Sequence, residues 1–247
     1  MKSLDTDLMI AKLKLLGFKD YTLYRQGRQH LTLFIQDKLE ILVIHDSVET
    51  VDVFCNYYTR DNTIKFTGYD IDLKVYGGRN LWHTKGMFSH CVFNSLDLSE
   101  FDTSKVIDMC GMFEHSIINK LNISNINTSS VKDMSFMFDA FKTDSLDISN
   151  FDTSKVRDMS YMFNNCHARS IKMSNIDTSN VTDMTYMFAN SEISKLDMDG
   201  VNAQKIKVMS DLFIKSDIKS INLGNDRNLM YNWKNRKEPS FNWWGTN

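Results

Sequence analysis

Apolar residues recur with a period of 25 residues through the middle and C-terminal half of the chain. The segment from Leu96 to Phe113 returns without insertion at Leu121, Leu146, Ile171 and Leu196. Four apolar columns keep this register: Val106, Val131, Val156, Val181 and Ile206; Met109, Met134, Met159, Met184 and Met209; Met112, Met137, Met162, Met187 and Leu212; Phe113, Phe138, Phe163, Phe188 and Phe213. One unit cannot bury its own columns, so the pattern predicts units that stack against one another.

The first part of each unit alternates apolar and polar residues, which predicts a short strand with one face turned inward. In the second unit the inward residues are Leu121 and Ile123. The outward residues there are Lys120, Asn122 and Ser124. Parallel pairing of such strands spaces the units about 4.8 Å apart.

The second part of each unit predicts a short helix or 3₁₀ turn, because Met109, Met112 and Phe113 have the i, i+3, i+4 spacing of one helical face. We interpret Asp108 as the N-cap of this segment. Its equivalents are Asp133, Asp158 and Asp183. A calcium-binding ladder is the alternative, and the missing glycine-rich turns argue against it. The Thr-Ser pairs, such as Thr153-Ser154, suit turns that satisfy buried backbone groups.

The repeat extends backwards into a degenerate unit and forwards to one last strand. The backward extension begins with Ile71 and Leu73, and the forward one ends with Ile221 and Leu223. We therefore predict an α/β solenoid in residues 71–225, a leucine-rich-repeat-like stack of about six 25-residue rungs with short parallel strands.

Residues 1–70 predict a small α+β N-terminal domain, which either caps the first rung or is itself the functional unit. A helical face is expected from Leu4, Leu8, Ala11 and Leu15, with Gly17 ending the helix. Strands are expected at 21–25, 31–36 and 39–44, the last two flanking a hairpin at 37–38, whereas 48–58 is ambiguous between strand and helix.

Residues 226–247 predict an aromatic C-terminal cap over the last rung. Its aromatic side chains are Trp233, Phe241, Trp243 and Trp244. An aromatic hot spot for a partner is the alternative.

The repeated segment from Phe151 to Cys166, Phe-Asp-Thr-Ser-Lys-Val-Arg-Asp-Met-Ser-Tyr-Met-Phe-Asn-Asn-Cys, resembles the BspA-like leucine-rich repeat. That repeat is also called the mycoplasma-lipoprotein and lactobacillus surface-protein repeat. The resemblance implies a curved solenoid. Many relatives are bacterial surface proteins that bind host or partner proteins.

Charge and hydropathy exclude some partners. With 29 basic and 31 acidic residues the chain has no global basic field, so we expect no direct nucleic-acid binding. No stretch approaches the roughly 20 apolar residues that span a bilayer, so we expect no membrane insertion. Because Asp5 and Asp7 interrupt the start, no secretory signal is visible, and we expect the cytoplasm of a bacterium or infected host cell, or the cell surface if a signal has been removed. The oligomeric state is left open.

The sequence contains none of the common catalytic, phosphate-binding or dinucleotide-binding motifs, so we expect no enzymatic activity and no cofactor. The four cysteines are too sparse for a disulfide framework, and none has the C-x-x-C spacing of a zinc site. His90 and His115 lie one register apart, but the histidines are otherwise scattered, so we expect no metal. An unrecognised site in residues 1–70 is the enzymatic alternative.

The leading hypothesis is a non-enzymatic scaffold for protein-protein recognition. We expect its contacts to come from an aromatic stripe at rung spacing, from outward strand positions and from variable loops. These residues are Phe136, Tyr161, Tyr186, Lys120, Asn122, Asp147, Lys172, Asp197, His115 and His167. One alternative is a phage- or mobile-element-encoded inhibitor that blocks a host protein or nucleoprotein complex. Another is a bacterial surface adhesin, which an upstream signal in the gene would support.

Overall fold

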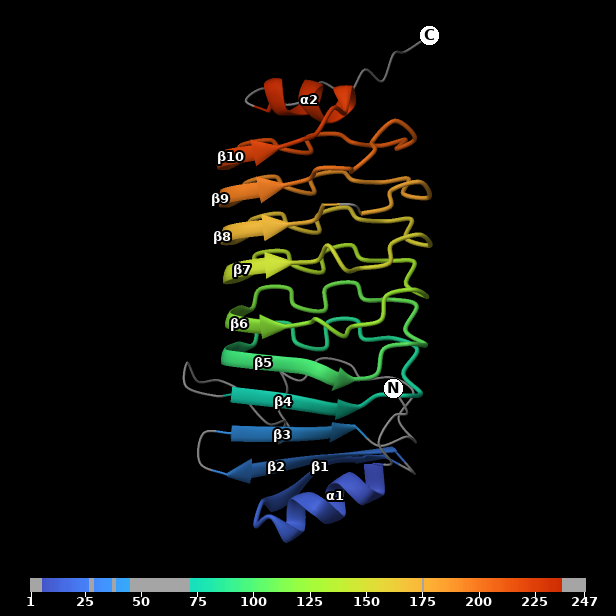
Figure 1. Cartoon of the computed structure of the whole chain (residues 1–247), viewed down its shortest axis with the longest axis vertical. Coiled ribbons are helices and arrows are strands. Elements are labelled where there is room, and N and C mark those ends of the chain that lie inside the picture. The colour runs from blue at the N-terminus through green and yellow to red at the C-terminus, as the bar shows by residue number, and fades with distance from the viewer. Residues whose placement is uncertain (1–5, 27–28, 37–38, 45–71, 175, 237–247) are drawn as a thin grey trace.

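The computed structural model of the chain describes residues 6–26, 29–36, 39–44, 72–174 and 176–236. They form a solenoid of about six turns, whose strands stack in chain order along the long axis of the molecule (Figure 1). Within the described ranges, ten strands form one sheet in the order β1 to β10. The predicted stack of rungs with short parallel strands is therefore confirmed.

The strands of the rungs pair in parallel. They are β4 (Asp72–Gly77), β5 (Val92–Phe101), β6 (Ile117–Asn122), β7 (Lys142–Asp147), β8 (His167–Lys172), β9 (Glu192–Asp197) and β10 (Asp217–Asn222). From β5 onward paired residues are 25 positions apart, as Leu96 and Leu121 are. Pairing is reduced between β6 and β7, where Ile117 and Lys142 are partners. Beside this junction, the buried hydroxyl of Thr143 has no hydrogen-bond partner among the described residues.

The second part of each rung consists of tight turns. Of the predicted short helix or 3₁₀ turn, the helix is wrong, whereas a turn closed by an i→i+3 hydrogen bond is present. The N–H of Met112 donates to the carbonyl of Met109 at 3.2 Å, which is the i→i+3 bond of a turn. Gly111 between them has a φ of +61°, a value outside any right-handed helix. The N–H of Phe113 donates to the carbonyl of Met137 in the next rung at 2.9 Å. Backbone donors that a helix would satisfy internally are thus satisfied by the neighbouring rung.

The aspartate before each methionine stabilises a turn and does not cap a helix. The Oδ1 atom of Asp108 accepts the N–H of Cys110, two residues further on, at 2.9 Å. The same contact recurs at Asp133, Asp158 and Asp183, between 2.8 and 2.9 Å. The predicted role in accepting a backbone N–H is therefore confirmed, while the expected N-cap is wrong.

The core is a continuous column of stacked side chains. The buried rings of Phe88, Phe113, Phe138, Phe163, Phe188 and Phe213 lie with neighbouring centroids 5.2 to 5.7 Å apart. Beside this column, the buried hydroxyl of Thr153 donates to the carbonyl of Asp177 in the next rung at 2.8 Å. Thr103, Thr128 and Thr178 make the equivalent bond. Each rung is therefore joined to the next through its core as well as through the sheet.

The N-terminal elements continue the same sheet. They are α1 (Thr6–Leu15), β1 (Lys19–Gln26), β2 (Gln29–Gln36) and β3 (Leu39–Ile44). β1, β2 and β3 pair antiparallel in that order, and β3 pairs in parallel with β4. The three strands predicted here are confirmed, while residues 37–38 and 48–58 lie outside the described part of the chain.

β3 is buried on both faces, because Leu42 and Ile44 join the solenoid core while Ile41 and Val43 pack towards α1. The side of α1 that packs there contains Ile10 and the buried Leu13. The predicted helical face is wrong for Ala11 and Leu15, which are exposed, and Leu4 lies outside the described residues. Gly17 follows the helix with a φ of +87°, in agreement with its predicted role.

The first rung departs from the 25-residue register in its strand. That register would place Leu73 beside Leu98, but Leu73 pairs with Leu96, and an irregularity follows between Lys74 and Tyr76. The inward residues of β4 are consequently Leu73 and Val75. The spacing is restored in the following turn, where His83 bridges to Asp108.

At the other end, α2 (Arg227–Lys234) covers the last rung. Its N-cap residue Asp226 accepts N–H groups from the first turn and also the N–H of Ala203 at 2.9 Å. Trp233 lies edge-on against Phe213, with centroids 5.5 Å apart, and Leu229 is fully buried. Phe241, Trp243 and Trp244 lie outside the described residues. Neither described helix has the length and apolar character to cross a bilayer.

Candidate partner-binding surface

Three half-buried aromatic side chains form a continuous row on the turn segments of consecutive rungs. The centroids of Phe136 and Tyr161 are 4.7 Å apart, and those of Tyr161 and Tyr186 are 5.1 Å apart, with stacked rings in both pairs. We call these three residues the aromatic ridge. The stripe that the repeat predicted is thus a stack of rings in contact.

The ridge stands on a backbone conformation that is unusual for aromatic residues. Phe136, Tyr161 and Tyr186 have φ values of 58°, 57° and 55°, in the left-handed region. The N–H of each donates to a carbonyl in the next rung, at 3.0, 2.9 and 3.0 Å. Because these bonds run from rung to rung, the ladder fixes the backbone and therefore the direction of each ring.

The two ends of the ridge differ. Beyond Tyr186 the same column holds Asp211, whose negative charge is the main cause that raises the pKa of the Tyr186 hydroxyl. Before Phe136 the column holds Gly111 and Gly86. An open pocket of about 480 Å³ lies there, lined by Lys85, Gly86, Ser89, Cys110, Gly111, Glu114 and Phe136. Sequence analysis missed this pocket, although the two glycines in the aromatic column were a visible signal.

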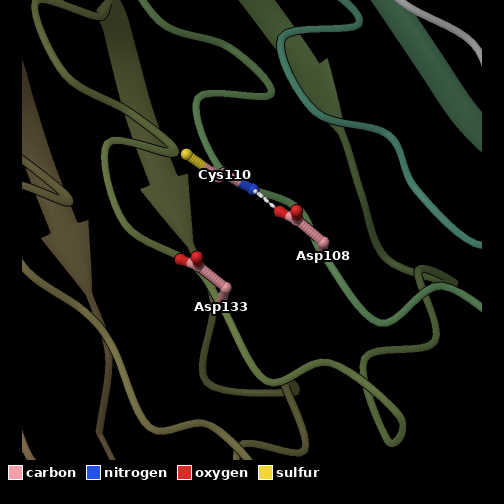
Figure 2. Close-up of side chains that lie close together, drawn as sticks. All are labelled: Asp108, Cys110 and Asp133. Carbon is pink, nitrogen blue, oxygen red and sulfur yellow. Dashed lines mark hydrogen bonds between the residues drawn. The ribbon is translucent and has the colours of Figure 1, made fainter.

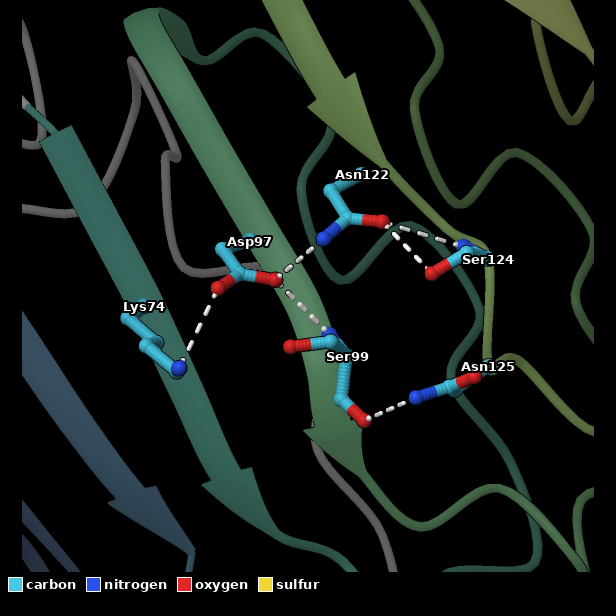
Figure 3. A network of polar contacts seen from close by, with 6 residues as sticks. All are labelled: Lys74, Asp97, Ser99, Asn122, Ser124 and Asn125. Carbon is cyan, nitrogen blue, oxygen red and sulfur yellow. Dashed lines mark hydrogen bonds and ion pairs between the residues drawn. The ribbon is translucent and has the colours of Figure 1, made fainter.

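The outward strand positions form a second, polar surface on β6 to β9. Lys120, Asn122, Asp147 and Lys172 are exposed, and Asp197 is half-buried. The amide of Asn122 donates to Asp97 Oδ1 at 2.8 Å in a network that continues from rung to rung (Figure 3). Lys172 Nζ and Asp147 Oδ2 lie 3.3 Å apart. The aromatic ridge lies on the turns, and this polar surface lies on the strands. The predicted contact residues therefore form two separate sets.

Neighbouring groups determine the charge state of this polar surface. Partial burial works to raise the pKa of Asp147, but hydrogen bonds from Ser149 and the ammonium group of Lys172 hold it below its usual value. The same balance, with Ser99 and Lys74 as the donors, lowers the pKa of Asp97. These carboxylates are therefore charged at neutral pH.

The two predicted histidines lie in different surroundings. The ring of His115 stacks on that of His90, with centroids 4.9 Å apart, and Nε2 lies 3.9 Å from Glu114. His167 begins β8, where its Nε2 lies 3.6 Å from Glu192. His115 therefore stacks on His90, which lies one 25-residue register before it, whereas His167 lies beside Glu192.

Two groups of side chains have spacings that a metal ion would require. Ligand atoms of Asp108, Cys110 and Asp133 lie within 4.8 Å of one another (Figure 2). Ligand atoms of Glu114, His115 and Asp139 do so as well. In the first group burial raises the pKa of the Cys110 thiol.

The cysteines are in different chemical states. Cys91 is disulfide-bonded, which the sequence did not predict. Cys110 and Cys166 are free thiols. Complete burial of Cys166 raises its pKa strongly, so this thiol is a packing residue of the core.

Comparison with known proteins gives one family. A family described as "Mycoplasma protein of unknown function, DUF285" matches residues 82–196 and 139–241, which cover the rungs from the first turn to the end of α2. No curated protein and no solved structure matches the chain.

Proposed function

The chain belongs to this family of Mycoplasma proteins of unknown function, DUF285, and we propose that it is a non-enzymatic scaffold that binds another protein. The observation that carries the proposal is the aromatic ridge, formed by Phe136, Tyr161 and Tyr186. Aromatic residues are enriched in protein-protein interfaces, where they supply large contact areas.

Rigidity supports this use of the ridge. Tyr161 is held between the rings of Phe136 and Tyr186, at 4.7 and 5.1 Å, and each of the three backbones is fixed by a hydrogen bond to the next rung. Ordering a flexible side chain on association costs about 0.5–1.5 kcal/mol. Rings that are ordered before binding avoid most of that cost, so a stacked ridge is a better contact surface than three separate aromatic residues.

The polar strand surface is the second contact region in this proposal. Opposite charges on neighbouring rungs pair there, as in the ion pair of Asp147 and Lys172. Exposed pairs of this kind contribute little to affinity, with typical values of about 0–1 kcal/mol. They act on orientation and on rejection of wrong partners. In this proposal, Lys120, Asn122 and Asp197 act with that pair at the rim of the interface.

The finer assignments belong to the same proposal. The 25-residue unit with its Asp-Met-x-x-Met-Phe segment supports a BspA-like leucine-rich repeat. The cytoplasm is the proposed site of action, and immunodetection of the chain in fractions of the source cells tests it. Recovery of the chain in the surface fraction would favour the adhesin instead.

Affinity capture with the full chain from an extract of the source cells tests the function. A ridge variant with Phe136→Asn, Tyr161→Asn and Tyr186→Asn removes the rings and keeps the left-handed backbone, which asparagine tolerates. A control variant with Lys155→Ala and Lys205→Ala removes two exposed charges that belong to neither surface. We expect one captured protein to be lost with the ridge variant and retained with the control.

Binding must then be reproduced with the purified partner. Loss of binding in the ridge variant, with an unchanged unfolding transition, supports the proposal. A chain that captures no protein, or whose partner binds the ridge variant as tightly as the wild type, contradicts it. The identity of the partner separates a scaffold for the cell's own proteins from an inhibitor of a foreign protein.

A further inference from the structure

We propose that the pocket before Phe136 receives an aromatic side chain of the partner protein, which extends the aromatic ridge by one ring. The inference rests on the proposed protein-binding function and names the chemistry of the partner's anchor. The residues that line the pocket include Gly86, Gly111 and Phe136, which are 25 residues apart in one column.

The backbone at the two glycines is the same as at the ridge. Gly111 and Gly86 both have φ values of 61°, close to those of Phe136 and Tyr161. Their N–H groups donate to carbonyls of the next rung at 2.9 Å, as the ridge residues do. The hydrogen-bond ladder therefore continues through the pocket, and what ends at Phe136 is the row of rings.

The spacing of the rungs determines where a further ring would lie. Rings in the ridge are 4.7 and 5.1 Å apart, because each rung carries one ring and rungs repeat at the spacing of paired strands, about 4.8 Å. A ring placed one rung before Phe136 would lie above Gly111 at that separation. This distance lies within the range preferred by stacked aromatic pairs.

The charged residues at the pocket match the polar edge of such a side chain. Glu114 offers a half-buried carboxylate, which accepts a hydrogen bond from an indole N–H or a phenol O–H. Lys85 offers an ammonium group on the same pocket, where it can lie over an aromatic face. An aliphatic side chain would use neither group. Tryptophan and tyrosine are therefore the side chains with the best chemical match.

The open form of the pocket favours a side chain carried by a protein. Sites for free small molecules bury about 70–90% of the ligand surface. The pocket before Phe136 opens to solvent beside the ridge, so a partner resting on Tyr161 and Tyr186 would close it with its own surface.

The test uses N-acetyl-tryptophanamide as the probe and N-acetyl-leucinamide as its aliphatic counterpart. Each is titrated into the ¹⁵N-labelled full chain, and amide chemical shifts are followed by NMR. We expect saturable shifts centred on Gly86 and Gly111, with a dissociation constant in the millimolar range, for the tryptophan amide alone. Absence of a saturable shift at these glycines, or an equal response to the leucine amide, overturns the proposal.

A pair of variants adds one ring at either end of the ridge. Gly111→Phe fills the pocket. Its Cβ meets the carboxylate end of Glu114 at 3.1 Å, so this flexible side chain must move by a few tenths of an ångström, and its backbone takes a φ that Phe136 already adopts in the same column. Asp211→Phe adds a ring beyond Tyr186, at a φ of 55°, without touching the pocket. We expect Gly111→Phe to weaken probe binding at least about tenfold, and Asp211→Phe to leave it unchanged. Equal binding in the two folded variants overturns the proposal.

The probe titration and the partner capture test different claims, so their results can be interpreted separately. A partner that depends on the ridge, together with a probe that does not bind at Gly111, refutes the pocket alone. Probe binding at Gly111 in a chain that captures no partner protein refutes the protein-binding function and leaves the site for an aromatic group in place.

Discussion

The rings of Phe136 and Tyr161 are parallel to within 5°, with centroids 4.7 Å apart, although both residues have a φ near +57°. A left-handed conformation costs an L-residue roughly 1–2 kcal/mol, so neither residue would choose it alone. The hydrogen bonds between rungs impose it at the same position in every turn. One consequence is that side chains 25 residues apart are forced into contact, whether they are buried or exposed.

The two aromatic columns should differ in their contribution to stability. Phe163 is fully buried between two other rings of the core, so Phe163→Ala should reduce the free energy of unfolding by about 3–5 kcal/mol. Tyr161→Asn removes a half-exposed ring and should cost about 1 kcal/mol or less, because asparagine accepts the left-handed backbone. Urea unfolding followed by circular dichroism measures both. Similar losses in the two variants would contradict the assignment of Tyr161 to the surface.

The threonine ladder gives a second stability prediction. Thr153→Val keeps the shape of the side chain but leaves the carbonyl of Asp177 without its hydroxyl donor. We expect a loss of about 1–3 kcal/mol, since the Thr153 side chain is buried. The control is Ser154→Ala, because the Ser154 hydroxyl bonds Asp152 on the exposed side of the same turn, and it should change stability by less than about 0.5 kcal/mol. A neutral Thr153→Val would show that the hydroxyl is dispensable.

The repeat could be predicted from sequence because the positions that recur as apolar residues are the positions that are buried. Val156, Met159, Met162 and Phe163 all lie in the core where the 25-residue register places them. The aromatic ridge followed from the same register, because in a stack of equal rungs any column becomes a row of contacts. The stack of rungs and the position of the ridge thus needed no information beyond periodicity.

The structure departs from the sequence prediction where hydrogen bonds between rungs replace hydrogen bonds within a rung. The i, i+3, i+4 spacing of Met109, Met112 and Phe113 is also produced by turns with a left-handed residue at Gly111, and side-chain spacing cannot separate the two. The shifted pairing of Leu73 depends on an irregularity in β4 that no periodic pattern records. The pocket before Phe136 depends on Gly86 and Gly111, which lack side chains. A pattern of apolar side chains does not reveal such positions.

The left-handed turns make a third prediction, at a position without an aromatic ring. Ala140 has a φ of 49°, where glycine is at no disadvantage. Ala140→Gly should therefore raise the free energy of unfolding by about 0.5–1 kcal/mol, the relief of strain exceeding the added chain entropy. Ala168→Gly, at the second residue of β8, should lower it by about 0.5–1 kcal/mol. Thermal unfolding compares the two, and a loss of stability in Ala140→Gly would contradict the strain at this turn.

The last prediction concerns pH and the buried carboxyl of Asp139. Burial raises its pKa, against the opposing effects of a hydrogen bond from Asn164 and the charge of His115. An acid with a raised pKa in the folded state binds more protons there than in the unfolded chain. Its contribution to stability is therefore largest below the ordinary carboxyl pKa and declines as pH rises through the raised value.

Asp139→Asn should remove this decline, because an amide does not titrate and its oxygen still accepts the bond from Asn164. Urea unfolding between about pH 3 and pH 7 should then show the variant gaining stability over the wild type as pH rises. Asp147→Asn is the control of opposite sign. Because the folded-state pKa of Asp147 is lowered, its stabilisation is present above the ordinary carboxyl pKa and is lost as pH falls. Parallel pH profiles for wild type and Asp139→Asn would show that burial does not perturb Asp139.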